Sequence, residues 1–281
     1  MKIDCFRWYL VVVLFVALSF ASCAQAPAPG KIERPRDPNT VSFQSSAAHA
    51  TFGGGALNLT GRLTKPDGKG PFPAIVLLHG CGGIQPKRDH RWAERLAGWG
   101  YVTLQVDSFR PRGLSNVCTY SGREATDILQ KRVTDGYDAK RYLAGLPFVD
   151  RSRIAVMGWS HGGITTLQIL YQKTDDPFRA AVAFYPSCRR MLTGLSAPLL
   201  ILIGEADDWT PAARCVEMMP KGQAASEVTL QVYPGAYHGF DTLDANTNVR
   251  GSRGMHHLQY DPAAEADAVI RVRAFFEKYL K

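Results

Sequence analysis

Six short, almost purely apolar runs recur along this chain of 281 residues, and polar or amphipathic stretches separate them. The runs are rich in Val, Ile, Leu and aromatic residues and are Phe72–Leu78, Tyr101–Val106, Ile154–Trp159, Ala180–Phe184, Leu199–Ile203 and Val228–Tyr233. Continuous runs of this length are typical of strands buried on both faces of a parallel sheet. Because helices must cover both faces, the pattern predicts a single doubly wound α/β domain.

Helix start signals and one alternating segment complete this pattern. Ser121 and Glu124 have the spacing of a capping box, and Asp261 followed by Pro262 places a cap before a helical proline. By contrast, Leu57–Leu63 alternates apolar and polar residues. This alternation predicts a half-exposed antiparallel strand at the edge of the sheet.

The composition excludes several classes of protein. Apolar residues make up 46% and charged residues 21%, a balance that does not fit a disordered chain, a collagen or a coiled coil. The net charge is +8, but the excess of basic residues forms no run of five like charges. We therefore expect no nucleic-acid partner, because no basic stripe is present to bind a phosphate backbone.

Residues 1–26 have the features of an export signal, since a basic start and a short apolar run precede small residues. Cleavage is expected near residues 22–24. Ordinary signal peptidase would leave Gln25 as the first residue, whereas a lipobox would make Cys23 the lipidated terminus. Phe20 stands where a lipobox usually has Leu and so favours the first version; a retained anchor helix is the third alternative. Both cleaved forms place the protein in the periplasm or outside the cell, on a membrane only if Cys23 is acylated.

A proline-rich linker is expected at residues 27–48, because prolines are dense there and apolar periodicity is absent. Folding is expected to begin between Val41 and Thr51, and the α/β domain is taken as residues 49–281.

Four cysteines remain after the expected signal: Cys81, Cys118, Cys188 and Cys215. In an oxidising compartment an even number favours disulfides, and no C-x-x-C spacing suggests a zinc site. Of the three pairings that four cysteines allow, we predict Cys81–Cys118 and Cys188–Cys215, because each joins neighbouring strand-to-helix loops. Buried free thiols are the alternative.

The most informative motif is G-W-S-H-G at residues 158–162, between an apolar run and the helical pattern Ile164–Leu170. In this context G-x-S-x-G is typical of a nucleophile elbow, a tight turn that lifts the serine above the sheet edge at a helix N-terminus. The alternative is a tight turn with an inert serine. We predict that Ser160 is the nucleophile.

A serine hydroxyl needs a base and an acid that orients the base, and in elbow hydrolases they follow in the order Ser, Asp or Glu, His. Asp207 and Asp208 follow the fifth apolar run, and His238 follows the sixth. The G-x-x-D spacing favours Asp207 as the acid, and Asp208 is then expected to cap the next helix. His238 is the predicted base, because His256 and His257 lie in a polar segment and are expected on the surface.

An oxyanion hole is expected beside the serine. The run Phe72–Leu78 ends in the glycine-rich turn H-G-C-G-G at residues 79–83. The backbone N–H groups of Cys81 and His161 would then hold the oxyanion. Cys81 itself lacks the elbow context of a nucleophile.

Together these motifs resemble the dienelactone hydrolase family of α/β-hydrolases, over nearly all of residues 50–281. The segments that carry the resemblance are residues 79–83, 107–109 (D-S-F), 112–113 (R-G), 158–163, 204–211 and 237–240 (Y-H-G-F). The resemblance implies a compact single-domain α/β-hydrolase with a mostly parallel sheet, helices on both faces, no large lid and no cofactor. No metal-binding constellation is visible in the sequence.

The sequence also departs from the founding members of the family. They carry cysteine where Ser160 stands and glutamate where Gly80 stands. Their arginine shortly after the histidine, which grips a substrate carboxylate, has no counterpart at Asp241 or Thr242. A broader carboxylesterase is therefore a better expectation than hydrolysis of the namesake lactone.

We expect an exported serine hydrolase that cleaves carboxylic esters or lactones of small molecules through an acyl-enzyme on Ser160. Arg110, Arg112 and Trp159 are the expected substrate contacts. Two alternatives stay open, namely a serine peptidase of the prolyl oligopeptidase type and a catalytically inactive binding lipoprotein.

Overall fold

The structure is a computed structural model that describes residues 38–46, 57–222 and 227–281. The expected signal and the first part of the expected linker lie outside these residues. The strands are β1 (Thr40–Ser45), β2 (Leu57–Thr64), β3 (Phe72–Leu78), β4 (Val102–Asp107), β5 (Val149–Trp159), β6 (Ala181–Phe184), β7 (Leu199–Gly204), β8 (Val228–Tyr233), β9 (Asn246–Gly251) and β10 (Gly254–Gln259). The helices are α1 (Pro86–Gly98), α2 (Gly122–Ala144), α3 (His161–Leu170), α4 (Ala212–Glu217) and α5 (Pro262–Leu280), with a 3-10 turn at Arg110–Arg112.

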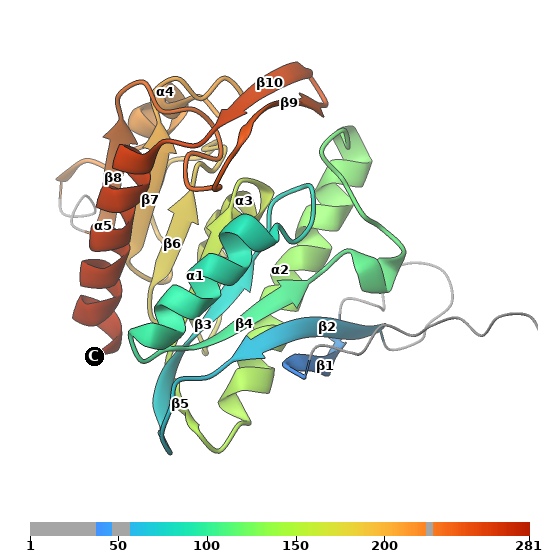
Figure 1. Cartoon of the computed structure of the whole chain (residues 1–281), viewed down its shortest axis with the longest axis vertical. Coiled ribbons are helices and arrows are strands. Elements are labelled where there is room, and N and C mark those ends of the chain that lie inside the picture. Colours follow the sequence, from blue (N-terminus) through green and yellow to red (C-terminus); the bar gives the residue numbers. More distant parts are fainter. Residues whose placement is uncertain (1–37, 47–56, 223–226) are drawn as a thin grey trace, which may run out of the picture. The chain divides into compact units, whose positions relative to one another are not determined.

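One eight-stranded sheet forms the centre of the fold, in the order β1-β2-β4-β3-β5-β6-β7-β8 (Figure 1). The strands from β4 to β8 in this order are parallel, and β2 and β1 are antiparallel at one edge. The chain reverses direction across the sheet at β3, because β4 lies on one side of it and β5 on the other. Parallel sheets bind ligands at the carboxyl ends of strands at such a switch point.

Helices cover both faces of this sheet. α2 packs against α3 on one face, while α1 and α5 lie on the other (Figure 1), joined by an ion pair of 2.8 Å between Arg91 and Glu265. The doubly wound α/β-hydrolase architecture predicted from the alternating runs is therefore confirmed. No helix within the described ranges is long and apolar enough to span a membrane.

The predicted apolar runs coincide with β3 to β8, and the side chains of β4, β6 and β7 are all buried. The largest difference is at β5, which begins at Val149 rather than at Ile154. After buried Val149, residues 150–153 are polar and partly or fully exposed, so no apolar run marks them.

At the edge of the sheet, the structure differs from the predicted edge strand and from the predicted start of the domain. β2 is antiparallel as predicted, but β1 pairs outside it and takes the edge position. β1 lies inside the expected linker, so the folded unit begins before residue 49. It folds there because Phe43 is buried against Tyr142 of α2, with ring centroids 5.2 Å apart.

The two predicted helix starts differ in their chemistry. Asp261 caps α5, since its Oδ1 accepts hydrogen bonds of 3.0 Å from the N–H groups of Ala263 and Ala264. Ser121 does precede α2, but its side chain makes no capping hydrogen bond. The capping box is therefore not formed.

Candidate active site

Ser160 lies at the end of β5, directly before α3, with φ of 53° and ψ of −113°. A positive φ is strained for a residue with a side chain, and it is the conformation that a nucleophile elbow imposes. The flanking glycines are required sterically. A Cβ on Gly162 would lie 1.9 Å from Leu78 O, and one on Gly158 would lie 2.3 Å from Gly162 O.

The loops after β7 and β8 bring Asp207 and His238 together. Asp207 Oδ2 lies 2.8 Å from His238 Nδ1, and both side chains are buried. With Nδ1–H donating to the carboxylate, His238 Nε2 is left free to accept a proton.

A set of donors holds Asp207 in place and in its charged form. Its Oδ1 accepts from the backbone N–H groups of Trp209 and Thr210, at 2.9 and 2.8 Å, and the Thr210 hydroxyl donates to Oδ2 at 2.8 Å. Burial alone would raise the pKa of Asp207. The adjacent His238 and the Thr210 donors outweigh burial and hold the pKa of this carboxyl below its usual value.

Asp208 has none of these contacts. Its carboxylate is half exposed and lies 3.4 Å from His256 Nδ1. It does not cap a helix either, because the residue before α4 is Pro211. The expectation that Asp208 is a helix cap is therefore wrong, whereas the structure places Asp207, not Asp208, against the histidine.

The end of β6 lies between the surroundings of Ser160 and those of His238. Ser160 N–H donates to Phe184 O at 2.9 Å, and the next residue, Tyr185, packs its ring 4.5 Å from the His238 ring. Among the described residues Ser160 Oγ has no hydrogen-bond partner. In ligand-free hydrolases the contact from serine to histidine is often long and tightens when substrate binds.

The predicted oxyanion donors lie on either side of the serine. His161 is the first residue of α3, so its backbone N–H has no acceptor within the helix. The turn at residues 79–83 also lies close, since a Cβ on Gly80 would be 3.7 Å from Ser160 Cβ. Buried His79 stabilises this turn through a 2.7 Å contact between its Nδ1 and Gly80 O.

Two disulfides lie beside the site. Cys81 is bonded to Cys118, and Cys188 is bonded to Cys215. The first joins the oxyanion turn to the loop before α2. The second joins the loop after β6 to α4, which follows the Asp207 loop.

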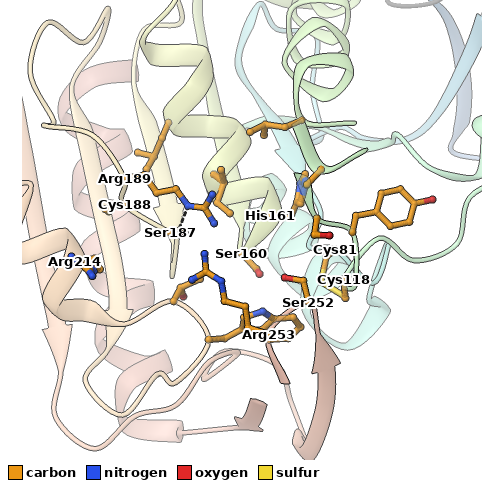
Figure 2. A pocket seen from close by; sticks show the side chains of 18 of the residues that line it. Cys81, Cys118, Ser160, His161, Ser187, Cys188, Arg189, Arg214, Ser252 and Arg253 are labelled. Atoms are coloured by element: carbon orange, nitrogen blue, oxygen red, sulfur yellow. Dashed lines mark hydrogen bonds between the residues drawn. A yellow bond between two sulfur atoms is a disulfide. The ribbon is translucent and has the colours of Figure 1, made fainter. Parts of the chain in front are cut away.

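A pocket of about 1050 Å³ opens over Ser160 and His161 (Figure 2). Part of its apolar lining comes from α2 and α3 and includes Leu129, Ile164 and Leu167. Four arginines also line it, namely Arg189, Arg190, Arg214 and Arg253. Figure 2 shows the side chains of Arg189 and Arg253 extending into the pocket near Ser160.

The predicted substrate contacts are elsewhere. Arg112 makes a bidentate ion pair with Asp135, with both distances 2.8 Å. Arg110 is 83% exposed beside Asp107, and Trp159 is fully buried. None of the three lines the pocket, so the structure does not bring these predicted contacts to this site.

The hairpin β9–β10 is the largest part of the site that the sequence analysis missed. It contributes Ser252, Arg253 and His256 to the pocket. The ring of Trp209 stacks on His256 at 4.9 Å and lies 5.1 Å from the ring of His238. His256 is therefore not a simple surface residue. The turn G-S-R-G at residues 251–254, between two six-residue segments, is the signal that could have predicted the hairpin.

The described residues contain no group of three or more His, Cys, Asp or Glu side chains arranged to hold a metal ion.

The fold and the site together define an α/β-hydrolase with a serine at its nucleophile elbow. The family model described as "dienelactone hydrolase family" matches residues 59–280. The chain belongs to the dienelactone hydrolase family.

Comparisons with individual proteins give the same fold. A dienelactone hydrolase-like promiscuous phosphotriesterase from metagenomic libraries superposes with a TM-score of 0.62 and 22% identity, covering 86% of this chain and 98% of that one. A propionate-bound thermophilic esterase of Thermogutta terrifontis gives a TM-score of 0.61 and 17% identity, covering 87% and 96%.

Human dipeptidyl peptidase 8 is 28% identical over 161 residues, which are 53% of this chain and 16% of that protein. This chain spans no more than 17% of the length of that protein and of two similar curated relatives, mouse dipeptidyl peptidase 8 and a probable dipeptidyl-aminopeptidase B of Grosmannia clavigera.

Proposed function

We propose that this protein is a serine hydrolase that cleaves carboxylic esters or lactones through an acyl-enzyme on Ser160. The observation that carries the proposal is the buried pair of Asp207 and His238, 2.8 Å apart at the same sheet edge as a strained Ser160.

In the acylation half of the reaction, Ser160 Oγ attacks the ester carbonyl carbon while His238 Nε2 takes its proton. The carbonyl oxygen becomes an oxyanion, which accepts hydrogen bonds from the N–H groups of Cys81 and His161. Protonated His238, stabilised by Asp207, then gives its proton to the leaving alcohol oxygen as the carbon–oxygen bond breaks. A water molecule releases the acid from Ser160 by the same steps, with His238 again as the base.

A panel of nitrophenyl esters with graded acyl length tests this proposal. We expect turnover by the wild-type protein and its loss in Ser160→Ala. Ser152→Ala, near the opposite end of the same strand, is the matched control and should hydrolyse at the wild-type rate. Full turnover by Ser160→Ala would contradict the proposal.

The pocket wall supports a preference for anionic esters. Arg190 lies over the ring of Tyr171 at 4.1 Å, and Arg214 pairs with Glu217 at 3.1 Å. Arg189 and Arg253 have no carboxylate partner among the described residues. Two unpaired guanidinium groups near the serine would attract a substrate carboxylate.

Paired substrates test the charge preference. Monoesters of a dicarboxylic acid and their neutral methyl diesters differ in one charge, and the ratio of their kcat/KM values should fall several-fold in Arg189→Gln and Arg253→Gln. An unchanged ratio in both variants would contradict the role of these arginines.

A serine peptidase is the second candidate, supported by the similarity to dipeptidyl peptidase 8. Aminoacyl nitroanilides and the matching nitrophenyl esters separate the two candidates, because peptidases also cleave the amide. Turnover of neither substrate class would favour the inactive binding protein.

We also propose that the protein is exported. The composition of residues 1–26 supports this, as does the presence of two disulfides, which persist in oxidising compartments. Intact-mass analysis of the mature protein distinguishes a Gln25 start from an acylated Cys23. An uncleaved Met1 start in an exporting host would contradict the proposed cleavage.

A further inference from the structure

A buried cation lies behind the predicted oxyanion hole. Arg132 of α2 is fully buried, and Nη2 donates to His79 O at 2.5 Å while Nη1 lies 2.6 Å from His161 Nδ1. His79 begins the oxyanion turn, and His161 supplies the other predicted donor. One guanidinium therefore joins both halves of the hole.

The surroundings of Arg132 do not neutralise it directly. Among the described residues no carboxylate makes an ion pair with its guanidinium. The nearby Asp135 pairs with Arg112, and its charge acts on Arg132 from a distance. Arg132 Nε is buried without a partner, and the guanidinium packs over the ring of Phe109 at 5.0 Å. Burial of an unpaired cation is costly, so its placement behind a reacting centre points to a role in that centre.

The same contact fixes the protonation state of His161. A guanidinium can only donate, so Nδ1 must accept, and the proton of the neutral ring is on Nε2. Burial, followed by the charge of Arg132, lowers the pKa of His161 to about 3, so the ring stays neutral. His161 lines the pocket beside Ser160, as Figure 2 shows.

We propose that His161 Nε2–H is a substrate-binding donor, kept in this tautomer by Arg132, and that it selects esters with an oxygen acceptor next to the scissile ester group. This inference rests on the proposed ester hydrolysis. His161 would contact the substrate, whereas Arg132 is a positioning residue that acts through His161 and the oxyanion turn.

Pairs of isosteric substrates, combined with two variants of His161, test whether Nε2–H donates to the substrate. His161→Phe keeps a ring but removes the donor, and His161→Gln places an amide N–H near the position of Nε2; both keep the backbone N–H. The substrates are nitrophenyl butyrate against nitrophenyl methoxyacetate for the acyl side, and butyl acetate against methoxyethyl acetate for the alcohol side. Each pair replaces one methylene by an ether oxygen.

We expect the ether-to-methylene ratio of kcat/KM to fall about three- to tenfold in His161→Phe for one pair, the loss of one hydrogen bond. His161→Gln should restore the ratio. Intrinsic reactivity cancels because each ratio is compared between variants. Ratios unchanged in His161→Phe for both pairs would overturn the inference, while the absence of all Ser160-dependent turnover would instead overturn the proposed function.

The tautomer is read independently of activity. In nitrogen NMR spectra of the wild-type protein, His161 should show an unprotonated Nδ1 and a protonated Nε2 at neutral pH. Arg132→Gln should shift the ring toward mixed tautomers, and Arg132→Lys, which keeps a donor, should restore the wild-type signals. A protonated Nδ1 in the wild-type protein would contradict the inference, whether or not the Arg132 variants fold.

Discussion

At the scale of single residues, the neighbouring aspartates Asp207 and Asp208 differ in the hydrogen-bond donors that surround them. Asp207 accepts from two backbone N–H groups, a hydroxyl and His238, whereas Asp208 is half exposed beside His256. A buried carboxylate with this many donors is charged and rigid. In the proposed mechanism, Asp207 holds the histidine ring and stabilises the imidazolium that forms in the reaction.

Exchange of each aspartate for asparagine separates the two roles. Asp207→Asn should lower kcat by about four orders of magnitude, because the amide no longer holds the Nδ1–H tautomer of His238. Asp208→Asn should change kcat by no more than a few-fold. Steady-state kinetics on the best ester of the panel measure both, and the reverse ranking would assign the acid to Asp208.

Another buried carboxylate, Asp241, stabilises the loop that carries His238. Its oxygens accept from Trp92 Nε1 and Trp159 Nε1, and from the Tyr185 hydroxyl, each at 2.8 Å. Trp159 is therefore a packing residue beneath the site.

At the scale of the elements, α1 and α5 are joined through Glu265. Its carboxylate accepts from Arg91 at 2.8 Å, from Arg95 at 3.2 Å and from the Tyr260 hydroxyl at 2.7 Å. Burial would raise the pKa of Glu265, but these three donors together outweigh it and lower the pKa below the usual value. A carboxyl with a lowered pKa stabilises the fold at pH values above its unfolded pKa.

We therefore expect Glu265→Gln to lower the free energy of unfolding by about 1–3 kcal/mol at pH 7. The difference from the wild type should shrink as the pH falls through 4.5 toward the lower folded pKa, because the wild-type carboxylate is then protonated too. Urea denaturation at several pH values measures it. Glu277 forms an exposed ion pair with Arg273 on the same helix, so the control Glu277→Gln should change the free energy of unfolding little at any pH. An effect of Glu265→Gln that does not vary with pH would contradict the argument.

The two disulfides should differ in their effect on catalysis. Their sequence separations are 37 and 27 residues, for which the chain-entropy model gives roughly 3–4 kcal/mol each. Replacement of Cys81 and Cys118 by alanine should also lower kcat, because this bridge supports the oxyanion turn. Replacement of Cys188 and Cys215 by alanine is the matched control, because it should lower the free energy of unfolding by a similar amount. An equal kcat in both double variants would contradict a role of the Cys81–Cys118 bridge in supporting the oxyanion turn.

The sequence predicted the strands that carry an apolar run or a clear apolar–polar alternation, including half-exposed β2, and missed strands in which few side chains are buried. The run of β3 matches to the residue because all but its first side chain are buried, and a strand buried on both faces is apolar. The run of β8 also matches, although its four central residues are partly or fully exposed. β1, β9 and β10 escaped because their polar residues face solvent and only a few side chains pack inward. Arg189 and Arg253 lie in loops, where no repeating sequence pattern predicts which way a side chain points. Their place at the pocket is therefore visible only in the folded structure.

At the scale of the whole domain, the order of the strands explains why one site collects all these residues. The carboxyl ends of β3, β5, β7 and β8 supply the oxyanion turn, Ser160, Asp207 and His238, and adjacent strands bring them within reach. The hairpin β9–β10 closes one side of the pocket, since His238 forms a bridge with Leu258 of β10. The proposed catalytic set could be predicted because its order along the chain follows this topology. Much of the pocket wall comes from loops and the β9–β10 hairpin, which the topology does not fix.

The central claim is that Ser160 is the activated nucleophile. The most direct measurement is mass spectrometry of the protein after reaction with a fluorophosphonate, followed by peptide mapping of the adduct. We predict one adduct on the peptide that contains Ser160, and none in Ser160→Ala. An adduct on any other residue, or undiminished labelling of Ser160→Ala, would contradict the account.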